Sequence, residues 1–420
     1  MTGEDRTRGG FEGLDACVHC GFCLQACPTF LATGDEADSP RGRIELMRGL
    51  ERGDIAATDI ALAYHLDRCL GCRGCEPVCP SGVHYGHGLE AARSRITAAR
   101  GTPRLARLAL WALTTPGVSG VVYWFARLLR SVLPRSVAGW GRIRFGLGML
   151  AATKPEGWNV GTLESGATSR SNLPTFQHSA LLFRGCVMEG LFSHVHDATR
   201  RTLAVNGYQV HEVPGQVCCG ALHAHAGLLE EARALARINI AAFGDGDEPI
   251  VVNSAGCGAL MKEYGHLVGD ERGERFGVRV RDVTELLAGD GTKGPVPGAP
   301  LDLHVAYDPP CHLLHAQGVA VQPLKLFAAI PLLELVSVPG AAECCGSAGL
   351  FTLLEPEMSR QVLAAKLERL REAAPQVVAT GNPGCLMQLG AGLAAAGIHA
   401  HARHPVELLD DAYRAAGRYE

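Results

Sequence analysis

The chain of 420 residues has no marked excess of either charge and few aromatic side chains. It carries 39 Lys and Arg against 43 Asp and Glu, for a formal net charge of −4. This balance argues against a nucleic-acid-binding protein, because such proteins present a strongly basic surface. Hydrophobic residues make up 47% of the chain and charged residues 20%, which excludes a disordered or fibrous protein. The length suggests roughly two to four domains.

The first residues, Met1 to Arg6, lack the basic and then apolar pattern of a secretory signal peptide. The chain contains 16 cysteines, but none lies between Cys79 and Cys186. A secreted disulfide scaffold is short and spreads its cysteines, whereas this long chain gathers many of them at gaps of two residues. We therefore expect a protein of the reducing cytosol whose cysteines are metal ligands.

Residues 101–155 contain no Asp or Glu, but seven Arg and one Lys. Within this basic stretch, 108–126 is uncharged and has nearly the length of a membrane span, about 20 residues. Pro116 interrupts it, and proline inside a helix costs roughly 3 kcal/mol. We expect two short helices with a basic face, and with Trp111, Tyr123, Trp124 and Phe125 on the apolar side. Either acidic lipid headgroups or partner subunits could bind this stretch, and the sequence leaves both open.

The first eight cysteines form two runs of identical spacing. These runs are Cys17-x2-Cys20-x2-Cys23-x3-Cys27-Pro28 and Cys69-x2-Cys72-x2-Cys75-x3-Cys79-Pro80. In bacterial ferredoxins with this spacing, three cysteines wrap one cubane and the fourth binds the other cluster. We therefore assign Cys17, Cys20, Cys23 and Cys79 to one [4Fe–4S] cluster, and Cys69, Cys72, Cys75 and Cys27 to a second. A zinc site is the alternative, but it typically uses two Cys-x2-Cys pairs for one metal. A helical pattern over 42–66 separates the runs and predicts a mainly helical module.

The other eight cysteines repeat one pattern twice. The first copy is Cys186, Cys218-Cys219-Gly220 and Cys257, and the second is Cys311, Cys344-Cys345-Gly346 and Cys385. The offsets between equivalent cysteines are 125, 126 and 128 residues, so two similar domains follow one another.

Each copy has the pattern of an α/β domain. Apolar runs of strand length lead into four of the cysteines, at 180–183, 250–252, 303–307 and 376–379. Helical stretches follow, for example at 226–243 and 357–373. Sites in open α/β sheets gather at the carboxyl ends of the strands, which is where these cysteines are expected. The glycine-rich stretch 288–299 is expected to link the copies. Its Gly289–Gly294 segment matches GxGxxG, but it follows a helix and leads into prolines, so we interpret it as linker.

Both copies resemble the cysteine-rich CCG domain of heterodisulfide reductases and their relatives. Adjacent cysteines make a strained disulfide, but they can direct two thiolates into one metal site. The family pattern ends in Cys-x-x-Cys, whereas Leu260 and Gln388 replace the last cysteine here. The resemblance implies one or two further iron–sulfur clusters, with these ligands: Cys186, Cys218, Cys219, Cys257, Cys311, Cys344, Cys345 and Cys385. Four thiols in each copy could bind an ordinary four-thiolate cluster or no metal.

The order of the parts resembles the iron–sulfur subunits of glycolate oxidase over nearly the whole chain. The strings that carry this resemblance are Gly185-Cys186-Val187, Cys218-Cys219-Gly220-Ala221, 254–259 with 262–265, 315–317 and 344–349. It implies an electron-transfer subunit with no catalytic residue and no flavin of its own. Two FAD-binding subunits would oxidise glycolate to glyoxylate, and also D-lactate, and electrons would leave to a quinone or other membrane acceptor. It also implies a cytoplasmic position, peripheral on the inner or plasma membrane.

The expected fold is therefore multidomain. A mainly helical two-cluster ferredoxin module (1–100) and basic linker helices (101–178) precede two tandem α/β CCG domains (179–290 and 300–420). One alternative function is a subunit like those of heterodisulfide reductase or anaerobic glycerol-3-phosphate dehydrogenase. Another is a scaffold whose second half has lost its metal and only binds flavoproteins.

Polar residues near the cysteines have weaker predictions. Six histidines lie near them in the sequence: His19, His84, His223, His225, His312 and His315. We interpret these as hydrogen-bonding or solvent-edge residues rather than ligands. We expect Lys262 and Glu263 on a solvated helix face.

Overall fold

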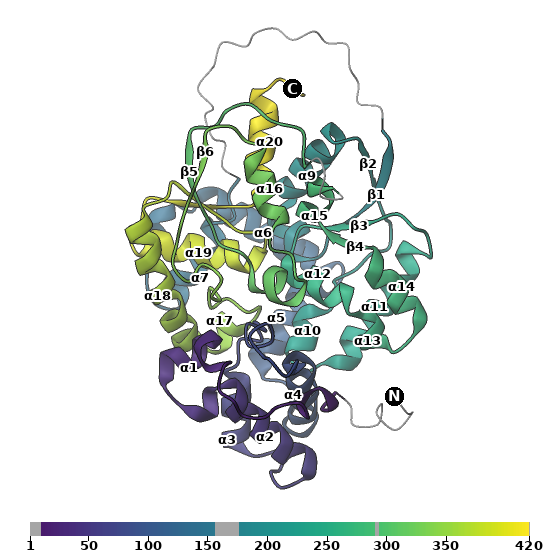
Figure 1. Ribbon diagram of the computed structural model, residues 1–420, viewed down its shortest axis with the longest axis vertical. Coiled ribbons are helices and arrows are strands. Elements are labelled where there is room, and N and C mark those ends of the chain that lie inside the picture. Colours follow the sequence, from purple (N-terminus) through teal and green to yellow (C-terminus); the bar gives the residue numbers. More distant parts are fainter. Residues whose placement is uncertain (1–9, 156–175, 290–293, 420) are drawn as a thin grey trace.

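The computed structural model describes residues 10–155, 176–289 and 294–419. Its helical N-terminal part, the ferredoxin module (10–100), lies at one end of the molecule, below two α/β units (Figure 1). We call these units the first repeat (178–288) and the second repeat (301–415). Linker helices connect the module to the first repeat.

The ferredoxin module is mainly helical, as expected. Its helices are α1 (Pro28–Thr33), α2 (Pro40–Arg52), α3 (Ile60–Asp67) and α4 (Tyr85–Arg100), with short 3-10 turns η1 (Glu12–Leu14), η2 (Leu24–Ala26) and η3 (Glu36–Asp38). The helix predicted over 42–66 is two helices, because Gly53 ends α2 in a left-handed conformation and the Asp59 side chain caps α3. Met47, Leu62 and Leu66 are buried between the helices.

The two short helices predicted on either side of Pro116 are confirmed, and the described part of the linker adds a third. These are α5 (Arg104–Thr114), α6 (Val118–Val132) and α7 (Arg142–Ala151), with the turn η4 (Arg135–Val137) before α7. α7 packs against the second repeat, which the apolar pattern alone did not indicate. Among the described residues no single helix is long and apolar enough to cross a membrane. Together α5 and α6 have that length and composition, but they are bent by 89° at the break around Pro116.

The prediction that Tyr123 shares the apolar side with the other three aromatic residues is wrong. Tyr123 is buried against Gly190 of the first repeat, and Arg127 donates to the Gly190 and Glu189 carbonyl oxygens at 2.6 and 2.8 Å. Trp124 and Phe125 are more than half exposed. The arginine-bearing face of α6 therefore packs inward, because Arg donors satisfy carbonyl oxygens at the C-terminal end of a short helix.

The first repeat is a four-stranded parallel sheet with helices on its faces. Its strands are β1 (His178–Phe183), β2 (Tyr208–Glu212), β3 (Ile250–Val252) and β4 (Val280–Asp282), in the order β2-β1-β3-β4. Its helices are α8 (Val187–Leu191), α9 (Ser193–Val205), α10 (Ala221–His225), α11 (Leu229–Phe243), α12 (Ala255–Lys262), α13 (Tyr264–Val268), α14 (Glu271–Arg279) and α15 (Val283–Ala288).

The second repeat has the same topology, which confirms the tandem duplication. Its strands are β5 (Leu303–Tyr307), β6 (Leu333–Val336), β7 (Val377–Ala379) and β8 (His401–Arg403), in the order β6-β5-β7-β8, all parallel. Its helices are η5 (His312–Ala316, a π-helix), α16 (Gln322–Ala328), α17 (Phe351–Leu354), α18 (Pro356–Ala373), α19 (Pro383–Ala395) and α20 (Pro405–Ala415).

The two repeats share one hydrophobic core. Leu182 and Val251 of the first sheet belong to the same cluster of buried side chains as Val305 and Val377 of the second. Buried apolar area of this kind stabilises by roughly 25 cal/mol per Å², so the repeats are held as one body. Of the expected linker, 290–293 lies outside the described residues, as does most of the Gly289–Gly294 motif.

Candidate iron–sulfur sites

The two ferredoxin-type loops have the same backbone conformation around their middle cysteines. Cys20 is flanked by His19 and Gly21, both with positive φ (56° and 86°), and Cys72 is flanked by Gly71 and Arg73, also with positive φ (61° and 60°). Such values are uncommon for His and Arg and occur where a tight conformation is required. Each loop therefore curls around its cysteines, as a loop that wraps a cubane must.

The cysteines assigned to the first cluster line one small cavity. Cys17, Cys20 and Cys23 from the first run meet Cys79, the last cysteine of the second run, and Cys75 also reaches this cavity. Burial raises the pKa of the Cys23 thiol, and thiolate charge on Cys17 and Cys27 raises it further. The structure thus brings the four sulfurs to one place, and their role as the ligands of one cluster stays a prediction.

The second set gathers around Cys69. Burial raises the pKa of the Cys75 thiol, and charge on Cys72, Cys69 and Cys27 raises it further. Cys27, the last cysteine of the first run, therefore lies close to the loop of the second run. The sulfur of Cys69 accepts hydrogen bonds from the Gly71 amide at 3.4 Å and from the Tyr85 hydroxyl at 3.5 Å. Although burial opposes it, the pKa of Cys69 is lowered, chiefly by nearby Arg43 and Arg93. These donors and cations favour a thiolate, the form that binds iron.

All eight cysteines of the repeats line a single cavity between the two repeats, with a volume of about 160 Å³. As predicted, strands precede four of these cysteines: β1, β3, β5 and β7 lead to Cys186, Cys257, Cys311 and Cys385. The two cysteine pairs follow β2 and β6, strands that the apolar runs did not indicate. Within a repeat the sulfurs lie close together. Cys186 and Cys218 are 3.6 Å apart, and Cys311 and Cys344 are 4.0 Å apart. Each repeat therefore offers a compact four-thiol site, and the two sites face one another.

The glycine after each cysteine pair is required by geometry. Gly220 and Gly346 have φ of 91° and 84°. A Cβ at Gly346 would lie 2.7 Å from the Ser359 carbonyl oxygen, and one at Gly220 would lie 3.2 Å from the Ala232 backbone. Only glycine combines a left-handed conformation with so close an approach of another chain segment. The turn directs both cysteines of each pair into the cavity.

Neighbouring thiols shift each other's acidity. Hydrogen bonds from Cys186 and Cys219 lower the pKa of Cys218, and those from Cys344 and Cys385 lower the pKa of Cys345. The pKa of Cys311 is lowered too, by its hydrogen bond from Cys344 and by His312. Each repeat therefore has at least one thiol that is ready to ionise, which suits a metal ligand.

The residues at the missing fifth cysteine positions are structural. Gln388 is fully buried, donates to Ser359 Oγ at 2.9 Å and accepts from Thr352 Oγ1 at 3.1 Å. Leu260 is buried in the apolar core of the first repeat. Neither residue lines the cavity of the eight cysteines. The donor set of each repeat thus stays at four thiols.

The expectation that Lys262 and Glu263 lie on a solvated helix face is wrong. Lys262 pairs with Glu285 at 2.7 Å, and Glu263 pairs with Arg73 at 2.6 Å. Arg73 stands between two cysteines of the second ferredoxin loop, so Glu263 joins that loop to the first repeat. No sequence signal indicated this pair, because its partners are separated by 190 residues.

The histidines divide between interfaces and solvent. His225 and His312 line the cavity of the eight cysteines, with ring centroids 5.3 Å apart. His223 is also buried and lies within hydrogen-bonding reach of Cys218. His19 pairs with Glu45 at the surface, and His315 contacts the Ala342 carbonyl oxygen at 3.2 Å.

Comparison with known proteins places these sites in a family. Residues 13–83 match the 4Fe-4S dicluster domain, and residues 180–262 and 305–390 each match the cysteine-rich CCG domain. The chain is 33% identical to the probable glycolate oxidase iron-sulfur subunit of Bacillus subtilis, over 96% of this chain and 94% of that protein. It is 32% identical to the glycolate oxidase iron-sulfur subunit of Escherichia coli, over 95% and 94% respectively. The chain belongs to the family of glycolate oxidase iron–sulfur subunits.

The predicted fold class is confirmed by these matches together with the two parallel sheets. The chain is thus an iron–sulfur protein of a family of non-catalytic subunits. The Lactate utilization protein A of Geobacillus kaustophilus is 31% identical over 54% of this chain and 97% of its own length. A relative that aligns with about half of this chain is therefore named for lactate utilization.

Proposed function

We propose that the chain is the electron-transfer subunit of a glycolate dehydrogenase complex. Two FAD-binding partner subunits oxidise glycolate to glyoxylate, and the clusters of this chain carry the electrons to a quinone or another membrane acceptor. A flavin receives two electrons at once, whereas a cluster carries one at a time. The partners would supply the flavin, and no residue of this chain acts on glycolate.

The observation that carries this proposal is the continuity of the thiol sites. Cys75, which is assigned to the second cluster, also lines the cavity of the first site. Cys72 of the second site packs in one apolar cluster with Cys311 and Cys344 of the second repeat. The second repeat then shares its cavity with the first. Clusters bound at these sites in succession would form a route for single electrons across the molecule.

The proposed cofactors are two [4Fe–4S] clusters in the ferredoxin module and one or two further clusters in the repeats. Cys17, Cys20, Cys23 and Cys79 would bind the first, and Cys69, Cys72, Cys75 and Cys27 the second. Iron analysis with EPR on anaerobically purified protein tests the count. About eight irons per chain would restrict clusters to the module, and about twelve to sixteen would mean that the repeats are loaded.

The substrate assignment is supported by the relatives. Two similar proteins that span nearly the whole chain are named for glycolate oxidase, and one that spans about half is named for lactate utilization. We propose glycolate as the substrate of the complex and D-lactate as a second one. The test is to co-express the chain with the flavoproteins that are encoded next to it and to follow the reduction of the clusters by glycolate with EPR. Clusters that stay oxidised with glycolate, yet are reduced by dithionite, would overturn the assignment.

A second candidate is a component of a reductase related to heterodisulfide reductase. The chain is 33% identical to a component of the fumarate reductase (CoM/CoB) of Methanothermobacter marburgensis, over 55% of this chain and 46% of that protein. Leu260 and Gln388, where the family has a cysteine, count against disulfide chemistry.

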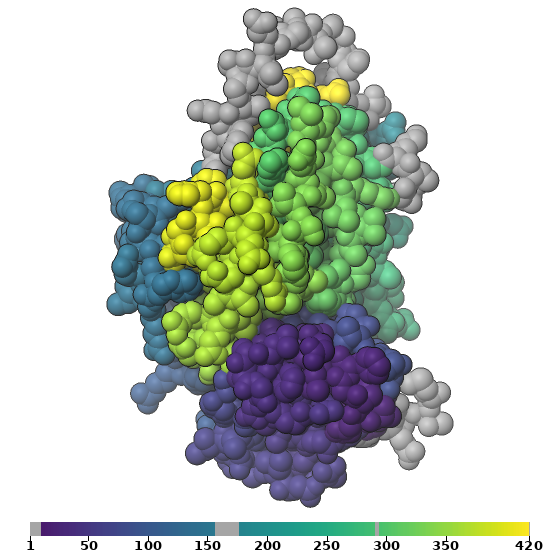
Figure 2. All heavy atoms as spheres, turned by 60° about the vertical axis from the view of Figure 1, so that its left-hand side comes forward, coloured from purple at the N-terminus to yellow at the C-terminus, as the bar shows by residue number. Residues whose placement is uncertain are grey.

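We further propose that α5 and α6 bind the surface of the membrane from the cytoplasmic side. Their outward faces carry exposed large apolar side chains: Leu105, Leu108, Trp111, Val121, Trp124, Phe125, Leu128 and Val132. Arg104 and Arg107 are exposed on the same helix as Trp111, and 101–155 contains no acidic residue that would repel anionic lipid. Exposed apolar and aromatic side chains flanked by Arg are typical of helices that lie in a membrane interface. Figure 2 shows linker residues, in blue, at one flank of the molecule.

Vesicle flotation tests this contact. The whole complex should float with vesicles that contain anionic phosphatidylglycerol, and Trp124→Ser with Phe125→Ser should abolish flotation while glycolate still reduces the clusters. Ile238→Ser, an exposed apolar residue of α11, serves as the control. Loss of the flavin subunits from the double variant would instead identify this face as their binding site and overturn the membrane proposal.

A further inference from the structure

A separate cavity lies between the linker and the second repeat, with a volume of about 590 Å³. Its lining comes from residues 140–149 of the linker and from 349–360 of the second repeat, together with Gln388 of α19. None of the lining residues is a cysteine. The volume falls in the range of small-molecule sites, roughly 300–1000 Å³. We call this the α7 cavity, after the linker helix that contributes to it.

The walls of the α7 cavity suit a flat, apolar ring. Trp140 and Phe145 stack with ring centroids 5.9 Å apart and an angle of 13° between their planes, and Met149 and Leu350 line the same space. Trp140 and Leu353 are 43% and 41% exposed, so the cavity is apolar where it opens to solvent. Aromatic rings pack well against one another in offset stacks. The cavity can therefore take a planar ring and lead an apolar tail out at its mouth.

Three polar side chains line the same cavity and bond to one another. Gln388 Nε2 donates to Ser359 Oγ at 2.9 Å, and Gln388 Oε1 accepts from Thr352 Oγ1 at 3.1 Å. A glutamine amide has two N–H donors, and within the described parts of the chain Gln388 uses one of them. The second is left for an acceptor inside the cavity, such as a ring carbonyl oxygen.

The first repeat shows that the fold does not require these polar groups. The glycine after each cysteine pair identifies equivalent positions, because an added Cβ there would meet the carbonyl oxygen of Ser359 in the second repeat and that of Ala232 in the first. Gln388 and Leu260 are also equivalent, since each lies three residues after the last cysteine of its repeat. Both residues of the first repeat are apolar and buried. Buried polar groups are costly, so their presence in one copy only, beside a cavity, favours a ligand there.

The α7 cavity adjoins the cysteines of the repeats. Gly349 and Leu350 line both this cavity and the cavity of the eight cysteines. A cluster in the second repeat would thus be separated from a ligand in the α7 cavity by one layer of residues. On the other side, α7 packs against α6, one of the two helices proposed to bind the membrane. The cavity therefore lies between a candidate cluster site and the helices through which a lipid-soluble molecule would arrive.

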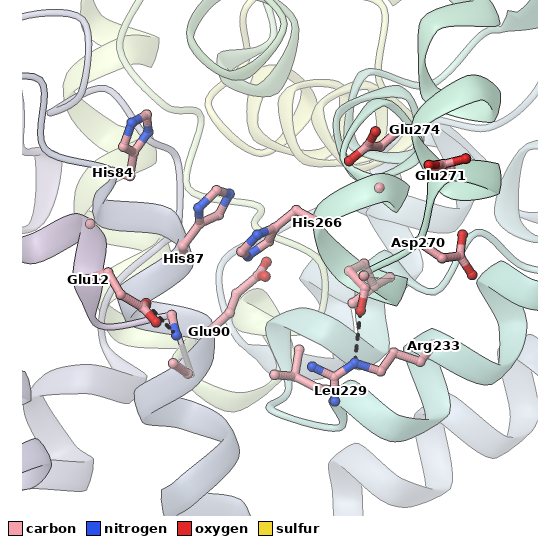
Figure 3. A pocket seen from close by; sticks show the side chains of 16 residues that line it. Glu12, His84, His87, Glu90, Leu229, Arg233, His266, Asp270, Glu271 and Glu274 are labelled. Carbon is pink, nitrogen blue, oxygen red and sulfur yellow. Dashed lines mark hydrogen bonds between the residues drawn. The ribbon is translucent and has the colours of Figure 1, made fainter. Parts of the chain in front are cut away.

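A larger cavity, of about 1060 Å³, lies between the ferredoxin module and the first repeat, but its lining suits an uncharged ring poorly. Figure 3 shows the acidic side chains that line it: Glu12, Glu90, Asp270, Glu271 and Glu274. An apolar ligand would displace the water that solvates these carboxylates, at a high cost. Its described lining also shares no residue with the cavity of the eight cysteines.

We propose that the α7 cavity binds the ring of an isoprenoid quinone, with Trp140 against the ring and Gln388 Nε2 donating to a ring carbonyl oxygen. This inference rests on the proposed function, because it assigns the electron acceptor and its site. The quinone takes up two electrons, one at a time, from the cluster of the second repeat. Two protons come from water at the mouth of the cavity, and the molecule leaves as the quinol.

Photolabelling of the whole complex, with its flavin subunits, locates the site. The probe is a short-chain ubiquinone analogue that carries an azide on its ring. Peptide mass spectrometry should find the label within 140–149 or 349–360, and an excess of the analogue without the azide should prevent labelling. Absence of label, or label confined to other parts of the chain or to the flavin subunits, would overturn the proposal.

Reoxidation of reduced clusters tests the two binding residues without glycolate. The clusters are reduced with limiting dithionite, and their reoxidation by the ubiquinone analogue is followed by rapid-freeze EPR. Gln388→Leu introduces the residue of the first repeat. This variant and Trp140→Leu should each raise the analogue concentration for half-maximal rate about tenfold, with the cluster spectra unchanged. The control is Gln361→Leu, the same exchange at an exposed position of α18 outside the cavity, which should behave as the unaltered complex.

An unchanged half-maximal concentration in both variants would overturn the proposal. So would altered or lost cluster signals in both variants with no change in this concentration, which would leave Trp140 and Gln388 with a structural role only. A failure of glycolate to reduce the clusters of the unaltered complex would instead be a failure of the proposed function, because photolabelling and the reoxidation of dithionite-reduced clusters would still detect the quinone site.

Discussion

Cys72 of the ferredoxin module and Cys311 of the second repeat lie at one apolar contact, with Leu70 and Cys344 beside them. Burial raises the pKa of the Cys72 thiol, and a thiolate at Cys311 raises it further, so charge at one site is felt at the other. Clusters bound at these two cysteines would therefore be neighbours, as the proposed electron route requires. The module is thus coupled to the second repeat first, and to the first repeat through the cavity that the repeats share.

Cys72→Ser should interrupt the route at this contact. The variant loses a thiolate of the second cluster, so we expect roughly four fewer irons per chain and a loss of glycolate-dependent quinone reduction to background. Val78→Ser, an exposed position in the same loop, should keep both. Iron analysis and the quinone assay check the result. Normal turnover of Cys72→Ser would contradict a relay through this cluster.

Tyr85→Phe should make the second cluster harder to reduce. The hydroxyl of Tyr85 donates to Cys69 Sγ, and a donor to a cluster thiolate stabilises the added negative charge of the reduced state. A difference of ~1 kcal/mol corresponds to a fall of roughly 40 mV in the one-electron potential. Potentiometric EPR titration measures it, with Tyr64→Phe, whose hydroxyl contacts Arg68, as the control. An unchanged or raised potential would contradict the role of this hydrogen bond.

Much of this arrangement could be predicted from local sequence. The cysteine spacing determined the two ferredoxin loops, and the apolar runs that end at Cys186, Cys257, Cys311 and Cys385 are strands β1, β3, β5 and β7. Local patterns could do this because a strand, its turn and the following cysteine are neighbours in the chain.

The contacts between domains could not be predicted in the same way. The composition of α6 shows an apolar and a basic side, but not which of them packs inward, and Arg127 turns inward because unpaired carbonyl oxygens of α8 lie there. Glu263 likewise gains its role from Arg73, which the fold brings from a distant segment. Charge and periodicity carry no information about such pairings until the domains are placed.

Gly346→Ala should destabilise the second repeat and disturb its cysteine pair. The new Cβ would meet the Ser359 carbonyl oxygen at 2.7 Å, in addition to the strain of a positive φ. We expect a cost of roughly 2–4 kcal/mol, seen as a lower thermal unfolding midpoint. Gly397→Ala is a matched control, because Gly397 has a φ of 67° but open space around it, so only the strain of about 1 kcal/mol remains. Equal midpoints for the two variants would contradict the clash.

The interface between the repeats should weaken as the pH falls. His404 is buried there, with Nε2 3.2 Å from the Asn253 carbonyl oxygen and Nδ1 accepting from the Val406 amide. Burial lowers the pKa of His404 to about 3, and that of His196, which contacts the Asn253 side chain, to about 4. An unfolded histidine has a pKa near 6.5, so the unfolded chain binds more protons between that value and the folded one. The stability contributed by the neutral rings is therefore complete above pH 6.5 and is lost as the pH falls from there toward 4 and 3, by up to about 1.4 kcal/mol per pH unit for each histidine.

Thermal unfolding at pH 7.5 and pH 5.0 measures the loss. His404→Gln, which does not titrate, should show a smaller difference between the two pH values, and an equal difference would contradict the assignment.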